Sequence, residues 1–417
     1  MMENKQLIDW KTDAWKNRDM VAWYAKRMEE NTGSNRLKNR IETELCERFL
    51  TGTELLDVGI GTGRASLPLA RKGFKLTGTD SSQAMLDECR RQAGALPVTL
   101  VPGDVKALPF PDARFDSLVS LNVMTHFPHV EEVLREWKRV IRPGGRLVFD
   151  IYALDHLSFS RGGAVSVDDL IALGADRFNM HLSLERLVSA ADEVGLTVVA
   201  TAPYGALFSG EYRHSAFHKP LQETHWWLRQ LSWLAQDDAL LEMALFLDRE
   251  WFGRLTSIVT GRYMVALENR ADPAANAAWL AGERALVGRL LGQPVRLEEL
   301  GDRLALPPAA WREAFDQHLD RLRNRTVAYF LLSTCFGRPD AVDWQDLAPR
   351  NGPSLARWAA AEGVDRRVQH FVRDWHRQPA MAPLAQAFGL DLASGLEYEL
   401  QRQLLARTLG AFNGKAE

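Results

Sequence analysis

The stretch Leu55-Leu56-Asp57-Val58-Gly59-Ile60-Gly61-Thr62-Gly63-Arg64 joins two different patterns of side chains. Its first residues form a short apolar run that predicts a buried strand, and residues 65–70 beyond it have helical apolar spacing. Between the two lie an acidic residue and glycines at three alternate positions. A strand, a glycine turn and a helix bring backbone N–H groups and a helix N-terminus up to a ligand. Glycine is needed there because a Cβ would block both the backbone conformation and the close approach. The stretch therefore predicts a ligand-binding turn.

Spacing separates the ligand classes that use such a turn. The dinucleotide fingerprint is G-x-G-x-x-G, but Arg64 stands where its last glycine would be. The phosphate-binding P-loop needs a lysine directly after its final glycine, and none follows here. What remains is D-x-G-x-G-x-G, which resembles motif I of the class I S-adenosylmethionine (SAM)-dependent methyltransferases of the small-molecule type. The resemblance implies SAM as the cofactor and an α/β fold with a Rossmann-like, seven-stranded sheet.

The next segments resemble the same family in the same order. Residues 74–79 predict a second strand that ends at Asp80, where a carboxylate can accept hydrogen bonds from a ribose diol. NAD enzymes use the same device, so Asp80 by itself indicates only an adenosyl ligand. Ser81 and Met85 follow, and the family places a methionine of this segment against adenine. A methionine of the apolar core is the alternative for Met85.

A loop further along the chain distinguishes the two cofactors. Residues 103–110 read Gly-Asp-Val-Lys-Ala-Leu-Pro-Phe and resemble the family's G-D-x-x-x-L-P-F loop, which an NAD domain is not expected to have. In the family the side chain of the aspartate, here Asp104, and the next backbone N–H, here of Val105, meet the adenine edge. Residues 122–127, beginning with Asn122, occupy the turn that faces the sulfonium in relatives. The segment Arg142-Pro143-Gly144-Gly145 and the strand after it resemble the family's L-R-P-G-G-x-L tail.

The N-terminal part of the chain predicts a helical cover over the cofactor edge. Residues 1–50 contain helix-compatible runs at Met20–Glu30 and Arg36–Phe49. In relatives this region covers the methionine end of SAM with an aromatic residue and a cation, which implies Tyr24 and Arg36 here. The resemblance as a whole implies a cofactor-binding set made of Tyr24, Arg36, Asp57, Gly59, Gly61, Gly63, Asp80, Ser81, Met85, Asp104, Val105 and Asn122.

Length and composition indicate the domain organisation. A chain of 417 residues predicts two domains, which we place at 51–270 for the SAM-binding methyltransferase domain and 276–417 for an all-α C-terminal domain. The aromatic-rich segment 206–258 reads as a helical lid over the acceptor pocket, because ligands of open α/β sheets bind at the carboxyl ends of the strands. Its His214 and His218 have ligand-like spacing, but no acidic or thiol partner accompanies them, so we expect no metal site.

Charge and hydropathy narrow the classes of partner. A net charge of -3 gives no general attraction to nucleic acid or to an anionic membrane. No apolar run approaches the ~20 residues that span a bilayer, and the N-terminus lacks the layout of a signal peptide. Three separated cysteines match no disulfide framework. We therefore expect a cytoplasmic protein with a small-molecule acceptor as its partner, and a homodimer formed through the C-terminal helices.

Three functions remain open from the sequence. The leading hypothesis is methyl transfer from SAM to a small, partly apolar metabolite, with His126 as the candidate base and Tyr152 as the next acceptor contact. Asp150 is a weaker candidate, since a strand-end aspartate commonly caps the local backbone. The second hypothesis is a peptide or protein methyltransferase that docks its substrate on the C-terminal domain. The third is a SAM-binding partner subunit without transfer activity.

Overall fold

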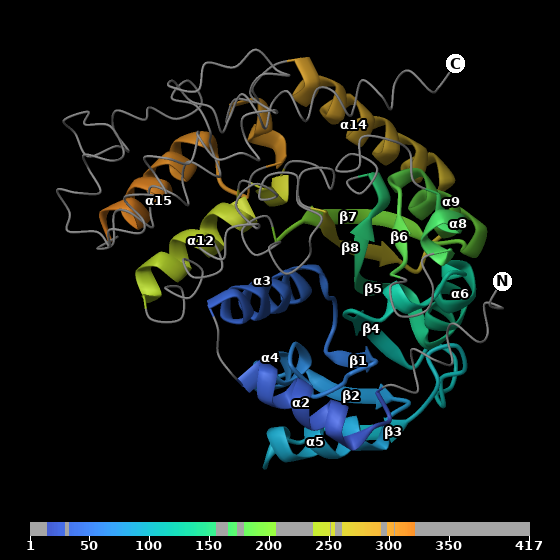
Figure 1. Cartoon of the computed structure of the whole chain (residues 1–417). Coiled ribbons are helices and arrows are strands. Elements are labelled where there is room, and N and C mark those ends of the chain that lie inside the picture. Colours follow the sequence, from blue (N-terminus) through green and yellow to red (C-terminus); the bar gives the residue numbers. More distant parts are fainter. Residues whose placement is uncertain are drawn as a thin grey trace.

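The computed structural model of the protein describes residues 15–29, 33–155, 166–172, 179–205, 237–250, 252–254, 261–292, 298–303 and 305–321. In these residues, eight strands form one sheet in the order β3-β2-β1-β4-β5-β8-β7, with β6 paired to β5 (Figure 1). The strands are β1 Glu54–Val58, β2 Lys75–Asp80, β3 Thr99–Pro102, β4 Phe115–Ser120, β5 Ile141–Ala153, β6 His181–Leu182, β7 Thr197–Pro203 and β8 Arg262–Glu268. The predicted seven-stranded Rossmann-like sheet is confirmed, and the two-residue β6 is an addition to it.

The order of the strands creates one topological switch point. The chain leaves β1 for β2 and β3 on one side, and it returns to β4 on the other side of β1. These strands and β5 pair in parallel, whereas β8 runs antiparallel between β5 and β7. The loops that follow β1 and β4 therefore diverge, which opens a crevice at the carboxyl ends of the strands, where ligands of such folds bind.

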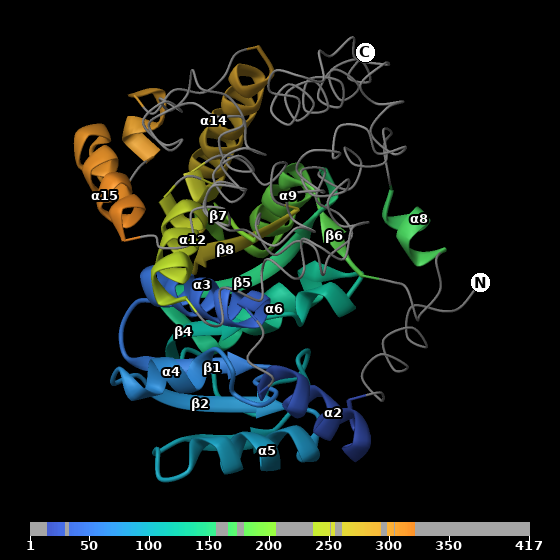
Figure 2. The same cartoon turned by 60° about the vertical axis from the view of Figure 1, so that its left-hand side comes forward.

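Helices cover both faces of the sheet (Figures 1 and 2). The α-helices of the described residues are α2 Arg18–Glu29, α3 Gly33–Phe49, α4 Ser66–Arg71, α5 Gln83–Ala93, α6 Val130–Val140, α8 Val167–Ile171, α9 Leu184–Val194, α12 Asp238–Glu250, α14 Pro273–Gly292 and α15 Pro308–Asp320. The 3-10 helices are η1 Met124–His126, η3 Phe252–Arg254 and η4 Glu298–Arg303. Helix α6 contacts β5 and α9, and α14 contacts α9 and β7, so these three cover one face. Helix α3 contacts β5 and β8.

The alternation of side chains along β5 separates an apolar face from a polar one. Leu147, Phe149 and Ile151 are fully buried in the core under α6 and α9, where Phe149 packs edge-on against Trp137 at a ring distance of 5.7 Å. Each such side chain stabilises the fold by roughly 1.5–3 kcal/mol. Asp150, between two of them, points to the opposite face, towards α3. The sheet thus places its buried charges on the side of the N-terminal helices.

The first helix after β8 lies at the start of the predicted C-terminal domain. Helix α14 begins at Pro273 and packs on the methyltransferase sheet. The fully buried Asn276 anchors it, accepting a hydrogen bond from the Val198 amide at 2.7 Å and donating to the Leu196 carbonyl at 2.9 Å. Residues 322–417 lie outside the described residues, so a C-terminal domain and a homodimer through it stay predictions.

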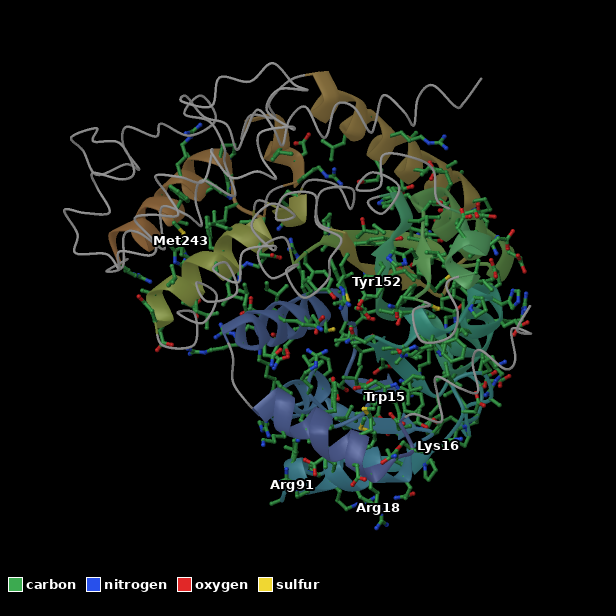
Figure 3. The ribbon with its side chains drawn as sticks, viewed as in Figure 1. Trp15, Lys16, Arg18, Arg91, Tyr152 and Met243 are labelled. Carbon is green, nitrogen blue, oxygen red and sulfur yellow. The ribbon has the colours of Figure 1, made fainter. Side chains whose placement is uncertain are left out.

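Part of the predicted lid also lies outside the described residues, namely 206–236, 251 and 255–258, which include His214 and His218. Its described helix, α12, packs against α3 and α15. Figure 3 shows Met243 of α12 well away from the labelled Trp15 and Tyr152. For the rest of residues 206–258, a helical lid over the acceptor pocket therefore stays a prediction. Among the described residues, no helix is both long and apolar enough to cross a membrane.

Candidate functional site

The glycine turn after β1 takes left-handed backbone conformations, with φ of 72° at Gly59, 53° at Gly61 and 79° at Gly63. Side chains with a Cβ rarely adopt these angles. Neighbouring atoms add a second constraint, since a Cβ on Gly59 would lie 2.4 Å from Val123 Cγ2 and one on Gly63 would lie 2.6 Å from Leu67 Cγ. At Gly61 a Cβ would meet nothing within 4 Å. The turn therefore leaves an open cradle in front of Gly61.

A pocket of about 430 Å³ opens at this cradle. Its volume lies in the range of pockets that hold small ligands, and its wall joins the glycine turn, the end of β2, the turn after β4 and the N-terminal helices. Eleven predicted site residues line it: Tyr24, Asp57, Gly59, Gly61, Asp80, Ser81, Met85, Val105, Asn122, His126 and Tyr152. Figure 3 labels two lining residues, Trp15 from the N-terminal segment and Tyr152 from β5. The structure therefore brings most of the predicted site together.

Substitution of Gly61 by alanine is expected to weaken S-adenosylhomocysteine binding by at least about tenfold, because the new methyl group would occupy the cradle. Titration calorimetry measures the affinity. Gly144→Ala is the matched control, because Gly144 also has a positive φ of 77° with open space beside it and does not line the pocket. An equal loss of affinity in both variants would attribute the effect to backbone strain and would contradict the assignment of the cradle.

Asp80 ends β2 directly beside the glycine turn. Its Oδ2 accepts a hydrogen bond from the Gly61 amide at 3.0 Å, and its Oδ1 accepts one from the Ser82 amide at 2.9 Å. Burial raises the pKa of this carboxyl, and the backbone hydrogen bonds from Ser82, Gly61 and Ser81 oppose that rise. A carboxylate oxygen has more than one lone pair, so both oxygens retain acceptor capacity towards a diol in the pocket.

Asp57 lies at the base of the turn and is buried. Burial raises the pKa of its carboxyl to about 7, and the nearby carboxylate of Asp80 adds to the rise, whereas the Arg64 guanidinium opposes it. A group with this pKa ionises readily when a cation arrives beside it. The part of the pocket next to Asp57 therefore suits a ligand that carries positive charge.

Apolar side chains form a slot on the β2–β3 side of the pocket. Ile60, Met85 and Val105 line it, and Met85 is 4% exposed. Asp104 does not line the pocket, and its Oδ1 accepts a hydrogen bond from the Lys106 amide at 2.8 Å. Gly63 also lies outside the lining, where it allows close packing of the helix that follows. The predicted contact of Asp104 with adenine stays a prediction.

The N-terminal cover supplies a different cation from the one predicted. Arg36 forms an ion pair with Asp238 of α12 at 2.5 Å and does not line the pocket. Lys38, one helical half-turn further along α3, does line it. Tyr24 and Trp15 also line the pocket, and their rings meet edge-on at 5.4 Å. Burial lowers the pKa of the Lys38 ammonium, while the Glu42 carboxylate raises it.

The other end of the pocket is lined by hydrogen-bonding side chains. Asn122 and His126 come from the turn after β4, and Tyr152 comes from the end of β5. The Tyr152 ring stacks on His181 at a distance of 5.1 Å and an angle of 29°. Asn179 completes this wall. The arrangement brings the two predicted catalytic residues, His126 and Tyr152, to one end of the pocket.

A buried charge network lies behind that wall. Arg262 is 3% exposed, and its Nη1 lies 2.8 Å from Asp150 Oδ2 and 3.2 Å from Glu42 Oε1. Arg64 also pairs with Glu42. Burial by itself would raise the pKa of Glu42, but Arg64, Lys38 and Arg262 together outweigh it and hold that pKa at about 2.

Several of these residues were not predicted from the sequence. Lys38 sits within a segment of mixed charge and gives no signal of its own. Arg262 carries one, because a charged residue directly before the apolar run Tyr263–Leu267 can mark a buried ion pair or a site. The described residues contain no group of three or more His, Cys, Asp or Glu side chains arranged to hold a metal ion.

Comparison with known proteins agrees with this geometry. Residues 56–149 match the family described as "Methyltransferase domain". A phosphatidylethanolamine N-methyltransferase from Cereibacter sphaeroides is 32% identical over 166 residues, which are 38% of this chain and 78% of that protein. A demethylmenaquinone methyltransferase from Tropheryma whipplei is 39% identical over 101 residues, 23% of this chain and 41% of that protein.

Among solved structures, one similar chain is a SAM-dependent methyltransferase from Thermotoga maritima, described as a possible histamine N-methyltransferase. Its TM-score is 0.36 and its sequence identity is 19%. The match covers 45% of this chain and 82% of that one. The sequence relatives carry the assignment, because the phosphatidylethanolamine N-methyltransferase is matched over more than three quarters of its length. The resemblance of the glycine turn to motif I and the expectation of SAM as the cofactor are thereby confirmed. The chain belongs to the family of SAM-dependent methyltransferases.

Proposed function

We propose that the protein transfers a methyl group from SAM to a small, partly apolar metabolite, which is an intermediate of a biosynthetic sequence. The observation that carries this proposal is a single pocket of about 430 Å³ that joins a cofactor wall to a wall of hydrogen-bonding side chains. A pocket of this size suits a cofactor and a small acceptor better than a polypeptide. The relatives named for a lipid headgroup and for demethylmenaquinone support an acceptor other than a polypeptide.

The pocket residues fit SAM, with Gly61 providing the cradle that a Cβ would fill. We assign the ribose diol to Asp80 and the adenine to the slot of Ile60, Met85 and Val105. We assign the methionine end to Lys38 and Tyr24, in place of the predicted Arg36. Support comes from position, because Lys38 and Tyr24 both line the pocket, whereas Arg36 pairs with Asp238 and does not line it.

When bound, SAM supplies an electrophilic methyl group on a sulfonium that leaves as a neutral thioether. The main task of the protein is to hold the acceptor in line with that methyl group, and orientation of this kind can account for a large part of a rate enhancement. We place the acceptor between His126 and Tyr152. If the acceptor atom carries a proton, His126 accepts it, a contribution of about 10²–10⁴-fold in rate. Tyr152 hydrogen-bonds the acceptor and fixes its orientation.

The affinity for SAM is expected to rise with pH up to about 7 and then to level off. The reason is that the cationic ligand favours the ionised form of Asp57, so binding at pH 6 releases part of a proton. Calorimetry in two buffers of different ionisation enthalpy measures that release. Asp57→Asn should abolish the proton release, whereas Asp155→Asn should preserve it. Asp155 is a matched control because burial also raises its pKa to about 7, but it does not line the pocket. Loss of the release in both variants would contradict the role of Asp57.

The proposal is tested in two steps with the full-length protein. The first is calorimetry with SAM, S-adenosylhomocysteine and NAD⁺, where we expect binding of the two sulfur ligands and none of NAD⁺. The second measures S-adenosylhomocysteine release with small phenols and quinols, small amines, phosphatidylethanolamine vesicles and unstructured peptides. Turnover with a small acceptor, reduced in His126→Ala and Tyr152→Phe, would support the proposal. Turnover with peptides alone would favour the peptide methyltransferase, and binding without turnover would favour the partner subunit.

A further inference from the structure

Arg262 joins four separate elements of the fold around its guanidinium group. Its partners are Glu42 on α3, Asp150 and Tyr152 on β5, Asn122 in the turn after β4, and Tyr204 just beyond β7. The side chain is 3% exposed and does not line the pocket. It therefore lies behind the pocket wall, in contact with two residues of that wall.

The first wall residue is Asn122, which has an unusual backbone. Its φ of 60° is left-handed, a conformation that few residues other than glycine adopt. Two contacts hold it there. The Asn122 amide donates to Asp150 Oδ1 at 2.5 Å, and its side-chain Oδ1 accepts a hydrogen bond from Arg262 Nη1 at 3.0 Å. Asparagine adopts this conformation more readily than most residues other than glycine, and the two contacts join its amide and its side chain to the Arg262–Asp150 ion pair.

The second wall residue is Tyr152. Its hydroxyl accepts a hydrogen bond from Arg262 Nη2 at 2.6 Å, and the guanidinium carbon lies 4.5 Å from the centre of the Tyr152 ring. One planar side chain therefore fixes both the hydroxyl and the ring. Lysine could not reproduce this arrangement, because an ammonium group is a point charge without the rigid fork of donors.

We infer that Arg262 is the positioning residue for the methyl-transfer end of the pocket. It acts by holding Asn122 and Tyr152, the two wall residues that we place at this end. The inference rests on the proposed function, because it takes the turn that begins at Asn122 as the side facing the sulfonium. Arg262 reaches neither cofactor nor acceptor itself. It sets the geometry of this end through its contacts with Asn122 and Tyr152.

The test compares two cofactor analogues and needs no known acceptor. S-adenosylhomocysteine lacks the methyl group, whereas sinefungin carries an amine in the place of the methylsulfonium and so reports on the methyl-transfer end. Calorimetry gives the ratio of the two affinities in the wild type and in Arg262→Lys. We expect S-adenosylhomocysteine affinity to stay within about threefold and the ratio of the two affinities to change by at least about tenfold. A purely structural role of Arg262 would change both affinities together and leave the ratio intact.

A matched control uses another arginine with a buried partner. Arg254 pairs with Glu250 at 3.2 Å, with side chains 13% and 6% exposed, and it does not line the pocket. Arg254→Lys should leave the ratio of affinities unchanged. An unchanged ratio in Arg262→Lys would overturn the inference, and binding of neither ligand by the wild type would instead overturn the proposed function.

A second variant covers the case in which Arg262→Lys does not fold. Tyr152→Phe removes only the hydroxyl that Arg262 holds and leaves the buried charges in place. It should shift the ratio in the same direction as Arg262→Lys, and the double variant should shift it by less than the sum of the two. Should Tyr152→Phe leave the ratio at the wild-type value, the inference fails, because the pathway through Tyr152 would then be absent.

Discussion

Replacing Asp80 with alanine is expected to weaken S-adenosylhomocysteine binding by about 10- to 150-fold, the equivalent of 1.5–3 kcal/mol for hydrogen bonds to a charged group. Two terms contribute to the loss. The ligand loses its ribose partner, and the glycine turn loses the carboxylate that holds the Gly61 amide at 3.0 Å. Calorimetry with the 2′-deoxy form of the ligand separates the two terms. In the wild type the deoxy ligand should bind more weakly, and in Asp80→Ala the two ligands should bind alike.

The matched control for Asp80 is Asp116, which lies at the amino end of β4, whereas Asp80 lies at the carboxyl end of β2. Its Oδ2 also accepts two backbone hydrogen bonds, from the Thr53 and Glu54 amides at 3.0 Å each. Asp116 does not line the pocket. Asp116→Ala should therefore lower stability but leave the affinity for S-adenosylhomocysteine unchanged. If the affinity fell equally in both variants, loss of overall stability would explain the effect and the ribose assignment would be wrong.

Replacing Glu42 with glutamine is expected to cost about 3 kcal/mol of unfolding free energy at pH 7. Glu42 is fully buried, and its folded-state pKa of about 2 lies below the ordinary value of 4.5, so folding favours its ionised form. That contribution is complete above pH 4.5 and is lost as the pH falls through about 2. The stability gap between wild type and variant should therefore narrow below pH 4.5. Urea denaturation at pH 7, 5, 4 and 3 measures it.

Glu44, on the same helix, is the control for Glu42. Its side chain is 23% exposed and pairs with Arg40 and Arg249, each at 3.0 Å. Partly exposed ion pairs contribute little, so Glu44→Gln should cost no more than about 1 kcal/mol. A comparably small cost for Glu42→Gln, or a gap that does not narrow in acid, would show that Glu42 is not held as an anion by Arg64, Lys38 and Arg262.

The parts of the site that could be predicted from the sequence depend on residues close to one another in the chain. The turn of Gly59, Gly61 and Gly63 was predictable because left-handed backbone and close approach both demand glycine. Asp80 was predictable because it ends a strand next to that turn. The second strand, predicted over residues 74–79 and ending at Asp80, is β2 Lys75–Asp80 in the structure. Each of these features depends on residues that are neighbours in the chain.

Two features needed the fold. Lys38 of α3 lines the pocket and the predicted Arg36 does not, because the rotation of α3 turns Arg36 towards Asp238 of α12. Helix α14 packs on the sheet through contacts with α9 and β7 and through the hydrogen bonds of Asn276, which its own sequence does not reveal. In both cases the deciding contact joins distant parts of the chain.

The sequence by itself determined the class of fold and, through the resemblance of its glycine turn to motif I, the cofactor, because both depend on motifs whose residues are neighbours in the chain. Only the tertiary structure decided which charges stand behind the pocket. Any two of Glu42, Asp150 and Arg262 lie more than a hundred residues apart in the chain. They meet in the fold because β8 runs antiparallel to β5 under α3. Buried charges are stable only when paired, and the identity of a partner across the sheet is a property of strand order and register. That is why Arg262 became visible as a positioning residue only in the folded chain.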